Sequence, residues 1–207
     1  EIYTLSLLVA LPICLAAVAA HVHTGEIDRG LEPARAPIAA LPNVSLHWGD
    51  AMKLDLAALE PAPTAMVANL PYSVATPLIL RTIELLPSLR RWSVMVQREI
   101  ADRLLAAPGS RTYGSPSVVA QLACEVELVR RVDPAVFRPR PRVDSAILGL
   151  RRTGPAADPT THALVRAAFA HRRKSLARSL EHGTRGSLAP ARAALAELGL
   201  PEDSRAE

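Results

Sequence analysis

The chain has 207 residues, of which 49% are hydrophobic and 21% are charged, and its formal net charge is +4. This length accommodates one substantial domain with a small appendage, and this composition excludes a wholly disordered chain. Two cysteines, Cys14 and Cys124, are too few for a disulfide framework or a cysteine-based zinc site, which favours a reducing, cytoplasmic compartment. The six histidines show no spacing typical of metal ligands, so we expect no metal.

Positive charge is concentrated in about one quarter of the chain. Residues 128–178 carry 12 basic and 3 acidic side chains, a net charge of +9, whereas residues 1–127 have a net charge of −3 and residues 179–207 of −2. Such a segment is typical of proteins that bind a polyanion, with nucleic acid as the first candidate and a membrane surface as the second. A solvated, arginine-rich surface is the alternative.

The first twenty residues are almost wholly apolar. Ala17-Val18-Ala19 resembles a signal-peptidase site, but no basic segment precedes it, and Pro12 interrupts what would otherwise be a spanning helix. We therefore expect a buried helix here and no membrane segment. Residues 1–15 are interpreted as an atypical apolar leader.

Short β-rich runs alternate with helical stretches along the rest of the chain. Strands are predicted at residues 22–27, 44–48, 64–70, 92–97, 125–132 and 143–150. Helices are predicted at residues 31–40, 76–86, 99–107, 117–123, 161–170, 174–182 and 189–198. Strands separated by crossover helices predict a mostly parallel α/β sheet covered on both faces, and the last two strands predict an antiparallel edge. We expect one domain over residues 16–154 and a small helical domain over residues 155–207.

Polar side chains stand at the ends of three successive strands. Glu26 closes the first predicted strand, Asp50 follows the second and Asn69 ends the third. Ligands of open α/β sheets bind at the carboxyl ends of the strands, where Glu26 could accept hydrogen bonds from ribose hydroxyls and Asp50 from an adenine amine. Turn formation or helix capping is the alternative for each residue taken alone.

The tetrapeptide Asn69-Leu70-Pro71-Tyr72 carries the sharpest chemical signal. An exocyclic base amine is a poor nucleophile, and two acceptors, an amide oxygen and a backbone carbonyl, would orient its lone pair outward. Asn69 supplies the first acceptor, and Pro71 restricts the backbone at Leu70. Tyr72 offers a flat face for a base taken out of its stack. A strand-terminating turn with a packed tyrosine is the alternative.

The stretch from Val67 to Arg152 closely resembles the ribosomal RNA adenine dimethyltransferases of the small-subunit type. Several motifs carry this resemblance in order: Asn69–Tyr72, Val96–Arg103, Pro108–Ser110 with Tyr113-Gly114, and Val136–Ser145. Upstream, Glu26–Arg29 and Gly49–Ala51 look like the cofactor motifs of the family, and downstream Arg172–Leu176 is similar to the signature of its helical domain.

The resemblance implies a Rossmann-like S-adenosylmethionine-dependent methyltransferase sheet with a small C-terminal α-helical domain. It implies that the chain dimethylates adenine exocyclic amines in small-subunit ribosomal RNA, as a cytoplasmic monomer that acts on the pre-ribosomal subunit. Catalysis is assigned to Asn69, Leu70, Pro71, Tyr72 and Phe137, and cofactor binding to Glu26, Asp50 and Asn69. The residues expected to hold the RNA backbone are Arg138, Arg140, Arg142, Arg172, Arg173 and Lys174.

One departure from the family pattern concerns the cofactor. The glycine-rich loop would fall about twenty residues before Glu26, where the chain has Leu5-Ser6-Leu7-Leu8-Val9 and no glycine precedes Gly25. We therefore expect the first strand and the glycine loop to be missing, and S-adenosylmethionine to bind weakly or not at all. Two other functions stay open, a non-catalytic RNA-binding or ribosome-assembly factor of the same fold and a large-subunit ribosomal RNA adenine methyltransferase.

Overall fold

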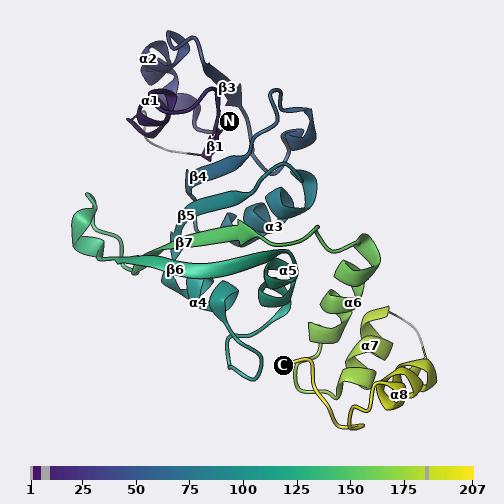
Figure 1. Cartoon of the computed structure of the whole chain (residues 1–207). Coiled ribbons are helices and arrows are strands. Elements are labelled where there is room, and N and C mark those ends of the chain that lie inside the picture. Colours follow the sequence, from purple (N-terminus) through teal and green to yellow (C-terminus); the bar gives the residue numbers. More distant parts are fainter. Residues whose placement is uncertain (1, 6–9, 185–186) are drawn as a thin grey trace.

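The computed structural model describes residues 2–5, 10–184 and 187–207 (Figure 1). Seven strands of these residues form one sheet in the order β3-β2-β1-β4-β5-β7-β6. In chain order the strands are β1 (Ile2–Leu5), β2 (Val22–Glu26), β3 (Val44–Trp48), β4 (Ala65–Asn69), β5 (Arg91–Gln97), β6 (Cys124–Val132) and β7 (Ser145–Arg152).

The sheet is parallel from β3 to β5 and antiparallel at β7 and β6. This confirms the predicted parallel sheet with an antiparallel edge. Because β1 to β5 run in one direction, the carboxyl ends of β2, β3 and β4 meet at one edge of the sheet.

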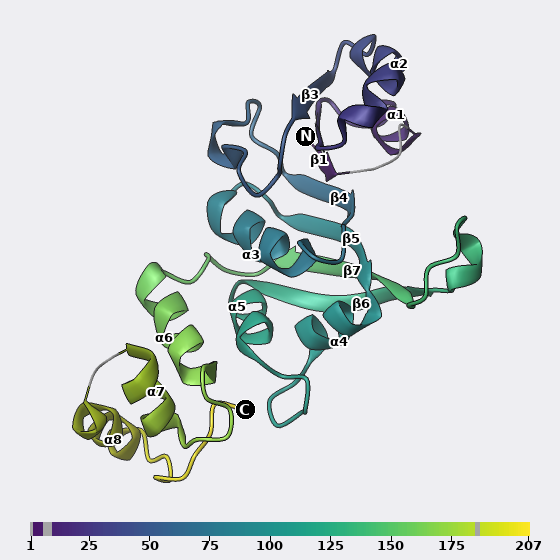
Figure 2. The same cartoon turned by 180° about the vertical axis from the view of Figure 1, so that it is seen from behind.

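Helices connect most of the strands and then form the C-terminal part of the chain. They are α1 (Ala10–Ala16), α2 (Arg35–Ala39), α3 (Ala75–Leu85), α4 (Arg98–Leu105), α5 (Ser115–Ala123), α6 (Pro159–Phe169), α7 (Leu176–Thr184) and α8 (Leu188–Glu197). Short 3₁₀ helices are η1 (Arg29–Ala34), η2 (Leu56–Ala58) and η3 (Pro134–Val136). Figure 2 shows α3, α4 and α5 on one face of the β4-β5-β7-β6 half of the sheet.

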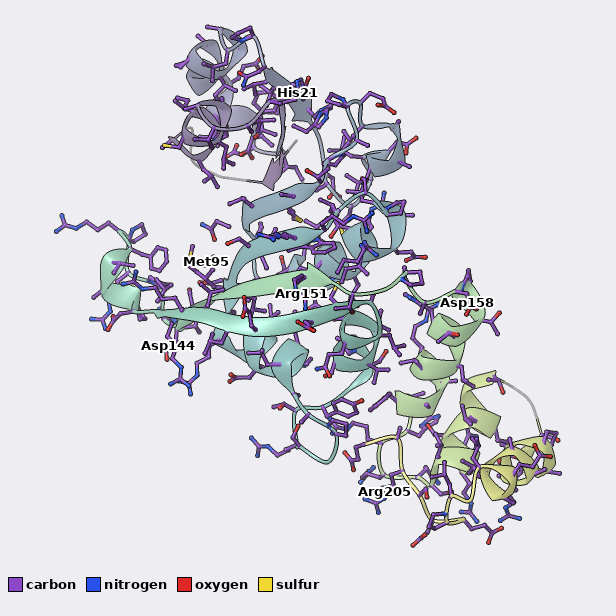
Figure 3. All side chains as sticks on the ribbon, in the orientation of Figure 1. His21, Met95, Asp144, Arg151, Asp158 and Arg205 are labelled. Atoms are coloured by element: carbon purple, nitrogen blue, oxygen red, sulfur yellow. The ribbon has the colours of Figure 1, made fainter. Side chains whose placement is uncertain are left out.

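The opposite face of this half carries no helix of the described residues (Figure 1). The expectation of a sheet covered on both faces is therefore wrong for β4 to β6. Alternation along β5 shows the asymmetry, since Trp92 and Val94 are buried under the helices whereas Arg91 and Ser93 are exposed. On the open face Arg151 of β7 forms an ion pair with Glu125 of β6 (Figure 3).

The core lies between α3, α4, α5 and the sheet and centres on Trp92, which is 2% exposed. Its Nε1 donates a hydrogen bond to Thr82 Oγ1 at 2.9 Å, and the guanidinium of Arg152 lies 5.2 Å from the ring centroid. Arg152 also donates to the carbonyls that follow the last turn of α3, those of Leu86 and Leu89. Burial of this guanidinium lowers the pKa of Arg152.

The N-terminal segment differs from the expectation of a single buried helix. Residues 2–5 form β1, which pairs with β2 and β4, so the expected loss of the first strand is wrong. Extended backbone can join a parallel ladder whatever its sequence motif, which is why the motif comparison misjudged this segment. The following α1 is partly exposed, with Ile13 38% accessible, and Val18 in the turn after it is 82% accessible. Within the described ranges no helix is both long and apolar enough to cross a membrane.

The three C-terminal helices pack on one another, and α6 also contacts α5 (Figure 1). Asp158 begins α6 as its N-cap and accepts hydrogen bonds from the backbone N–H groups of Thr160 and Thr161. The hydrogen bond from the Thr161 hydroxyl, together with these backbone donors, lowers the pKa of Asp158 to about 2. An edge-to-face contact of Tyr113 with Phe169, at 5.8 Å, links the α4–α5 loop to α6. A domain boundary near residue 155 stays a prediction.

Candidate active site

The polar residues at the three strand ends lie around one cavity. Glu26 ends β2, Asp50 follows β3 and Asn69 ends β4, and all three line a cavity of about 260 Å³. Ile27, Met52 and Leu78 are among its apolar lining residues. The parallel strands bring these side chains together although more than 40 residues separate Glu26 from Asn69 in the chain.

Both carboxylates of this cavity are oriented by backbone donors. Glu26 Oε1 accepts hydrogen bonds from the N–H groups of Ile27 and Asp28, each at 2.8 Å. Asp50 Oδ1 accepts from Met52 N at 2.9 Å. Each residue therefore closes a turn through one carboxylate oxygen, and its second oxygen takes no part in that turn.

Gly49 supplies the backbone conformation of the turn that follows β3. Its N–H donates to the Glu26 carbonyl at 2.9 Å, and its φ of +148° is one that residues with a side chain rarely adopt. The turn therefore places Asp50 beside Glu26, and it depends on the glycine that directly precedes Asp50 in the sequence.

These features fit the expected cofactor, S-adenosylmethionine. Its ribose hydroxyls and adenine amine are donors that suit Glu26 and Asp50, and the apolar wall suits the adenine ring. The segment Ser6–Val9, where the glycine-rich loop was expected, lies outside the described residues. Weak binding of the cofactor therefore stays a prediction.

A second cavity of about 260 Å³ adjoins the first. Asn69 and Pro71 line both cavities, so these two residues stand at the boundary between them. The remaining residues that line the second cavity are Leu70, Tyr72, Met95, Phe137, Pro139 and Pro141. The structure therefore brings Phe137 to the tetrapeptide from a distant part of the chain.

The tetrapeptide is held at both ends. Leu70 is buried, and its N–H donates to the Met95 carbonyl of β5 at 3.0 Å, which continues the ladder one residue past β4. Val74 N donates to the Pro71 carbonyl at 3.1 Å and closes a turn. Tyr72 lies on this turn, is 37% exposed, and shares a hydrogen bond of 3.1 Å with Ser145 Oγ.

Phe137 and three of the predicted RNA-binding arginines lie on the connection from β6 to β7. We call residues 133–144 the arm, which extends away from the sheet in Figure 1. Asp133 is the N-cap of η3 and accepts a hydrogen bond from Ala135 N at 2.7 Å, and Phe137 is the C-cap of this short helix. The exposed arginines follow along the arm: Arg138, Arg140 and Arg142.

The second predicted RNA-binding group lies in a turn, and the helix expected to begin at Lys174 begins two residues later. Arg172, Arg173 and Lys174 lie in the turn between α6 and α7, because α6 ends at Phe169 and α7 begins only at Leu176. Arg172 donates to the Arg111 carbonyl at 3.1 Å and to Glu207 at 2.7 Å. The two views place this turn and the arm at opposite sides of the molecule, so the fold does not bring the basic groups together (Figures 1 and 2).

Two residues that contact the tetrapeptide were assigned no function from the sequence. Met95 and Ser145 contact the tetrapeptide from β5 and β7, and Figure 3 labels Met95 and the neighbouring Asp144. Alternation along β7 could have found Ser145, because it faces away from the core-facing Ala146 and Leu148. Finding Ser145 from the sequence would also have required knowing that β7 pairs with β5.

The histidines of β2 and β3 form a separate cluster. His23 is buried, its Nε2 bonds the Pro61 carbonyl at 2.9 Å, and its Nδ1 bonds His47 Nε2 at 3.1 Å. His21 bonds Ser45 at 3.0 Å. Throughout the described ranges, no group of three or more His, Cys, Asp or Glu residues has an arrangement that could hold a metal ion.

Comparisons with known proteins agree with this geometry. The family described as "Ribosomal RNA adenine dimethylase" matches residues 11–196. A "Ribosomal RNA small subunit methyltransferase A" from Rubrobacter xylanophilus is 45% identical over 196 residues, which cover 93% of this chain and 74% of that protein. A protein of the same description from Streptomyces avermitilis is 49% identical over 152 residues, covering 71% of this chain and about half, 51%, of that protein.

Among solved structures, a dimethyladenosine transferase from Plasmodium falciparum has a TM-score of 0.77 at 22% identity. The alignment covers 99% of this chain and 83% of that chain, and it shows a shared fold. The family match covers far more than half of the chain, and a relative at 45% identity is matched over most of its own length. The chain therefore belongs to the ribosomal RNA adenine dimethylase family.

Proposed function

We propose that this chain is an S-adenosylmethionine-dependent enzyme that dimethylates adenine exocyclic amines of small-subunit ribosomal RNA. One observation carries the proposal: Asn69 lies between a cavity with two carboxylates and a cavity with aromatic side chains. A methyl donor in the first cavity and a base in the second would meet at this amide. Family membership and relatives described as small-subunit methyltransferases support the same chemistry.

The cofactor supplies an activated methyl group on a sulfonium ion. Glu26 and Asp50 hold its adenosine part through the oxygens that their turns leave available. Because this electrophile is already activated, the protein needs no strong general base, and positioning carries the rate.

Asn69 and Leu70 orient the acceptor amine. The Asn69 side-chain oxygen and the Leu70 carbonyl accept the two amine hydrogens, which favours a pyramidal nitrogen with its lone pair aimed at the methyl group. Leu70 is suited to this task because the hydrogen bond of its N–H to Met95 and the following Pro71 fix the backbone.

Tyr72 and Phe137 clamp the base, and the arm holds its RNA. Both aromatic side chains line the second cavity, one from the turn after β4 and the other from the arm. Stacking on an aromatic side chain is worth about 1–3 kcal/mol per base. The exposed arginines of the arm are adjacent to this cavity and meet the phosphates of the same RNA.

The proposal includes the partner and location that such a substrate requires. A pre-ribosomal small subunit is the partner, the cytoplasm is the compartment, and one chain forms the complete site. Glu26, Asp50, Asn69, Tyr72 and Phe137 all come from the same chain, which supports a monomer as the active form.

Asn69→Ala tests the proposal. We expect the single-turnover rate of methyl transfer to fall on the order of 100-fold or more, because the amide acts mainly when the nitrogen becomes pyramidal. Binding of S-adenosylmethionine and of RNA, measured by calorimetry and filter binding, should change much less.

The chain's other asparagine provides the control. Asn43 Nδ2 donates to the Ala16 and Ala19 carbonyls and secures the end of α1, far from the chemistry. Asn43→Ala should lower the melting temperature and leave the rate per folded molecule unchanged. If Asn69→Ala keeps a near-normal single-turnover rate, Asn69 is a turn residue and the amine-orienting mechanism is wrong.

A non-catalytic RNA-binding factor is the second candidate, and the sequence Leu5–Val9 favours it because it holds no glycine. Titration of the chain with S-adenosylmethionine separates the two functions. Micromolar binding supports the enzyme. RNA binding without cofactor binding supports the assembly factor.

A further inference from the structure

The hydroxyl of Tyr72 has a specific partner that stacking does not require. Tyr72 Oη and Ser145 Oγ lie 3.1 Å apart, and 73 residues separate them in the chain. Ser145 is 2% exposed. A buried hydroxyl without a partner is costly, so this hydrogen bond is expected to persist in solution.

Ser145 is one of the most firmly held positions near the site. It is the first residue of β7 and pairs with Gln97 of β5 and with Val132 of β6. The carbonyl of the preceding Asp144 accepts a hydrogen bond from Arg98 N at 2.9 Å, and its carboxylate forms an ion pair with Arg98 at 3.3 Å. Both neighbouring strands and the start of α4 therefore fix Ser145.

Tyr72 is held much less firmly by its own segment. It lies on the turn after β4, and its side chain is 37% exposed. A tyrosine has two side-chain torsions, and an exposed ring on a turn samples several orientations unless its far end is fixed. The bond to Ser145 fixes that end.

Ser145 also directly follows the arm that carries Phe137. The arm leaves the sheet after Val132 and returns to it at Ser145, so one hydrogen bond connects the tetrapeptide to the base of the arm. Tyr72 and Phe137 line the same cavity from these two segments.

We propose that Ser145 is a positioning residue that holds the Tyr72 ring at the angle at which an adenine can stack between Tyr72 and Phe137. The inference rests on the proposed function, and it assigns the tyrosine hydroxyl a role separate from that of the ring. A phenylalanine at position 72 keeps the stacking face and loses the orientation.

Fluorescence of an RNA that carries 2-aminopurine in place of one adenine tests the proposal. Tyr72→Ala, which removes the stacking face, defines the signal without stacking. We expect Ser145→Ala and Tyr72→Phe each to lower the equilibrium constant for the stacked base by about three- to tenfold, the range typical of one hydrogen bond. The double variant should be no worse than either single variant, because both remove the same bond.

Ser93→Ala is the matched control, since it makes the same change on the open face of neighbouring β5, where Ser93 is exposed. It should leave the stacking constant unchanged. If wild type and Tyr72→Ala give the same signal, no base stacks in the cavity, and the proposed function itself fails. If wild type differs from Tyr72→Ala but Ser145→Ala matches wild type, the positioning role alone is wrong.

A second measurement does not need RNA and reports on the Tyr72 ring directly. The protein labelled with 3-fluorotyrosine gives a resonance for Tyr72 that Tyr72→Phe identifies by its disappearance. Ser145→Ala should shift this resonance and leave that of Tyr113 in place. In Ser145→Cys the Tyr72 resonance should lie between its positions in Ser145→Ala and in the wild type. An unshifted Tyr72 resonance in folded Ser145→Ala overturns the proposal.

Discussion

Glu26 and Asp50 each accept backbone hydrogen bonds and also line the first cavity. One oxygen of each accepts backbone N–H groups and closes a turn, and the side chain as a whole lines the cavity. Turn formation and ligand binding, which the sequence offered as alternatives, are therefore compatible. The turn fixes the direction in which the remaining oxygen points.

The histidine cluster of β2 and β3 depends on neutral rings. His23 must donate from Nε2 to the Pro61 carbonyl, so its Nδ1 accepts from His47 Nε2 when both rings are neutral. Burial lowers the pKa of His47, and the nearby rings of His23 and His21 lower it further. Protonation of His47 is therefore less favourable in the folded than in the unfolded chain.

We expect the free energy of unfolding to decrease as the pH falls from 7 to 5. A lowered folded-state pKa means that the unfolded chain binds the proton first, so stability is lost as the pH falls below the ordinary imidazole value of about 6.5. The loss should be below about 1 kcal/mol, because water still reaches part of the ring. Urea unfolding at several pH values measures it.

His47→Gln should flatten this pH dependence, since the amide can still donate to His23 and does not titrate. His162→Gln on α6, outside the cluster, is the control and should keep the wild-type profile. An unchanged pH profile in His47→Gln would show that other groups cause the dependence.

At the scale of elements, α6 and α7 approach each other so closely that their contact requires a glycine on α7. A Cβ built on Gly183 of α7 would lie 2.6 Å from Cα and Cβ of Ala167 on α6. Ser179 Oγ, one turn earlier, donates to the Ala167 carbonyl at 2.8 Å. The contact therefore combines backbone packing with a specific hydrogen bond.

Gly183→Ala should destabilise the protein by about 1–3 kcal/mol, the usual cost of overpacking. The sign opposes helix propensity, which favours alanine over glycine by about 1 kcal/mol in a helix. Chemical denaturation measures the change. Gly154→Ala is the control, because its added Cβ would meet only the Leu122 carbonyl at 3.9 Å. Equal stability of the two variants would rule out the close helix contact.

At the scale of the whole molecule, the positive segment of residues 128–178 separates into groups with different tasks. Arg152 is half-buried, donates to the Leu86 carbonyl and lies over Trp92, and Arg151 pairs with Glu125. The arginines of the arm are exposed beside the second cavity, and those of the α6–α7 turn lie on the other side of the molecule. Only part of the net charge of +9 can therefore contact one RNA strand in one place.

The triple variant Arg138→Ala, Arg140→Ala and Arg142→Ala should weaken RNA binding and flatten its salt dependence. Removing three phosphate contacts lowers the slope of log affinity against log salt by about 2 to 3. Filter binding of a small-subunit ribosomal RNA fragment at several salt concentrations measures this slope.

Arg90→Ala with Arg91→Ala is the control, because these exposed arginines lie at the start of β5, at the opposite end of the strand from the cavities. This variant should keep the wild-type slope. A triple variant with the parental slope would identify the arm as a solvated loop.

Local sequence determined the elements and the chemical character of the site. The period-two pattern of β5, the glycine turn after β3 and the proline after Asn69 act within a few residues, so they could be read from the chain. The strand of residues 44–48 has the predicted bounds, and several helices differ from the prediction by one or two residues. The motifs that resemble the family also span only a few residues each, and they identified Glu26, Asp50 and the tetrapeptide.

Only the tertiary structure decided which distant residues meet. Strand order placed β1 at the centre of the sheet, left one face of β4 to β6 open, and brought Phe137 and Ser145 to the tetrapeptide. It also packed Arg152 against the edge of the core while Arg138 stayed exposed, although both belong to one basic segment. Such pairings depend on hydrogen-bond ladders and packing between segments far apart in the chain, and no local pattern of side chains records which ladder forms.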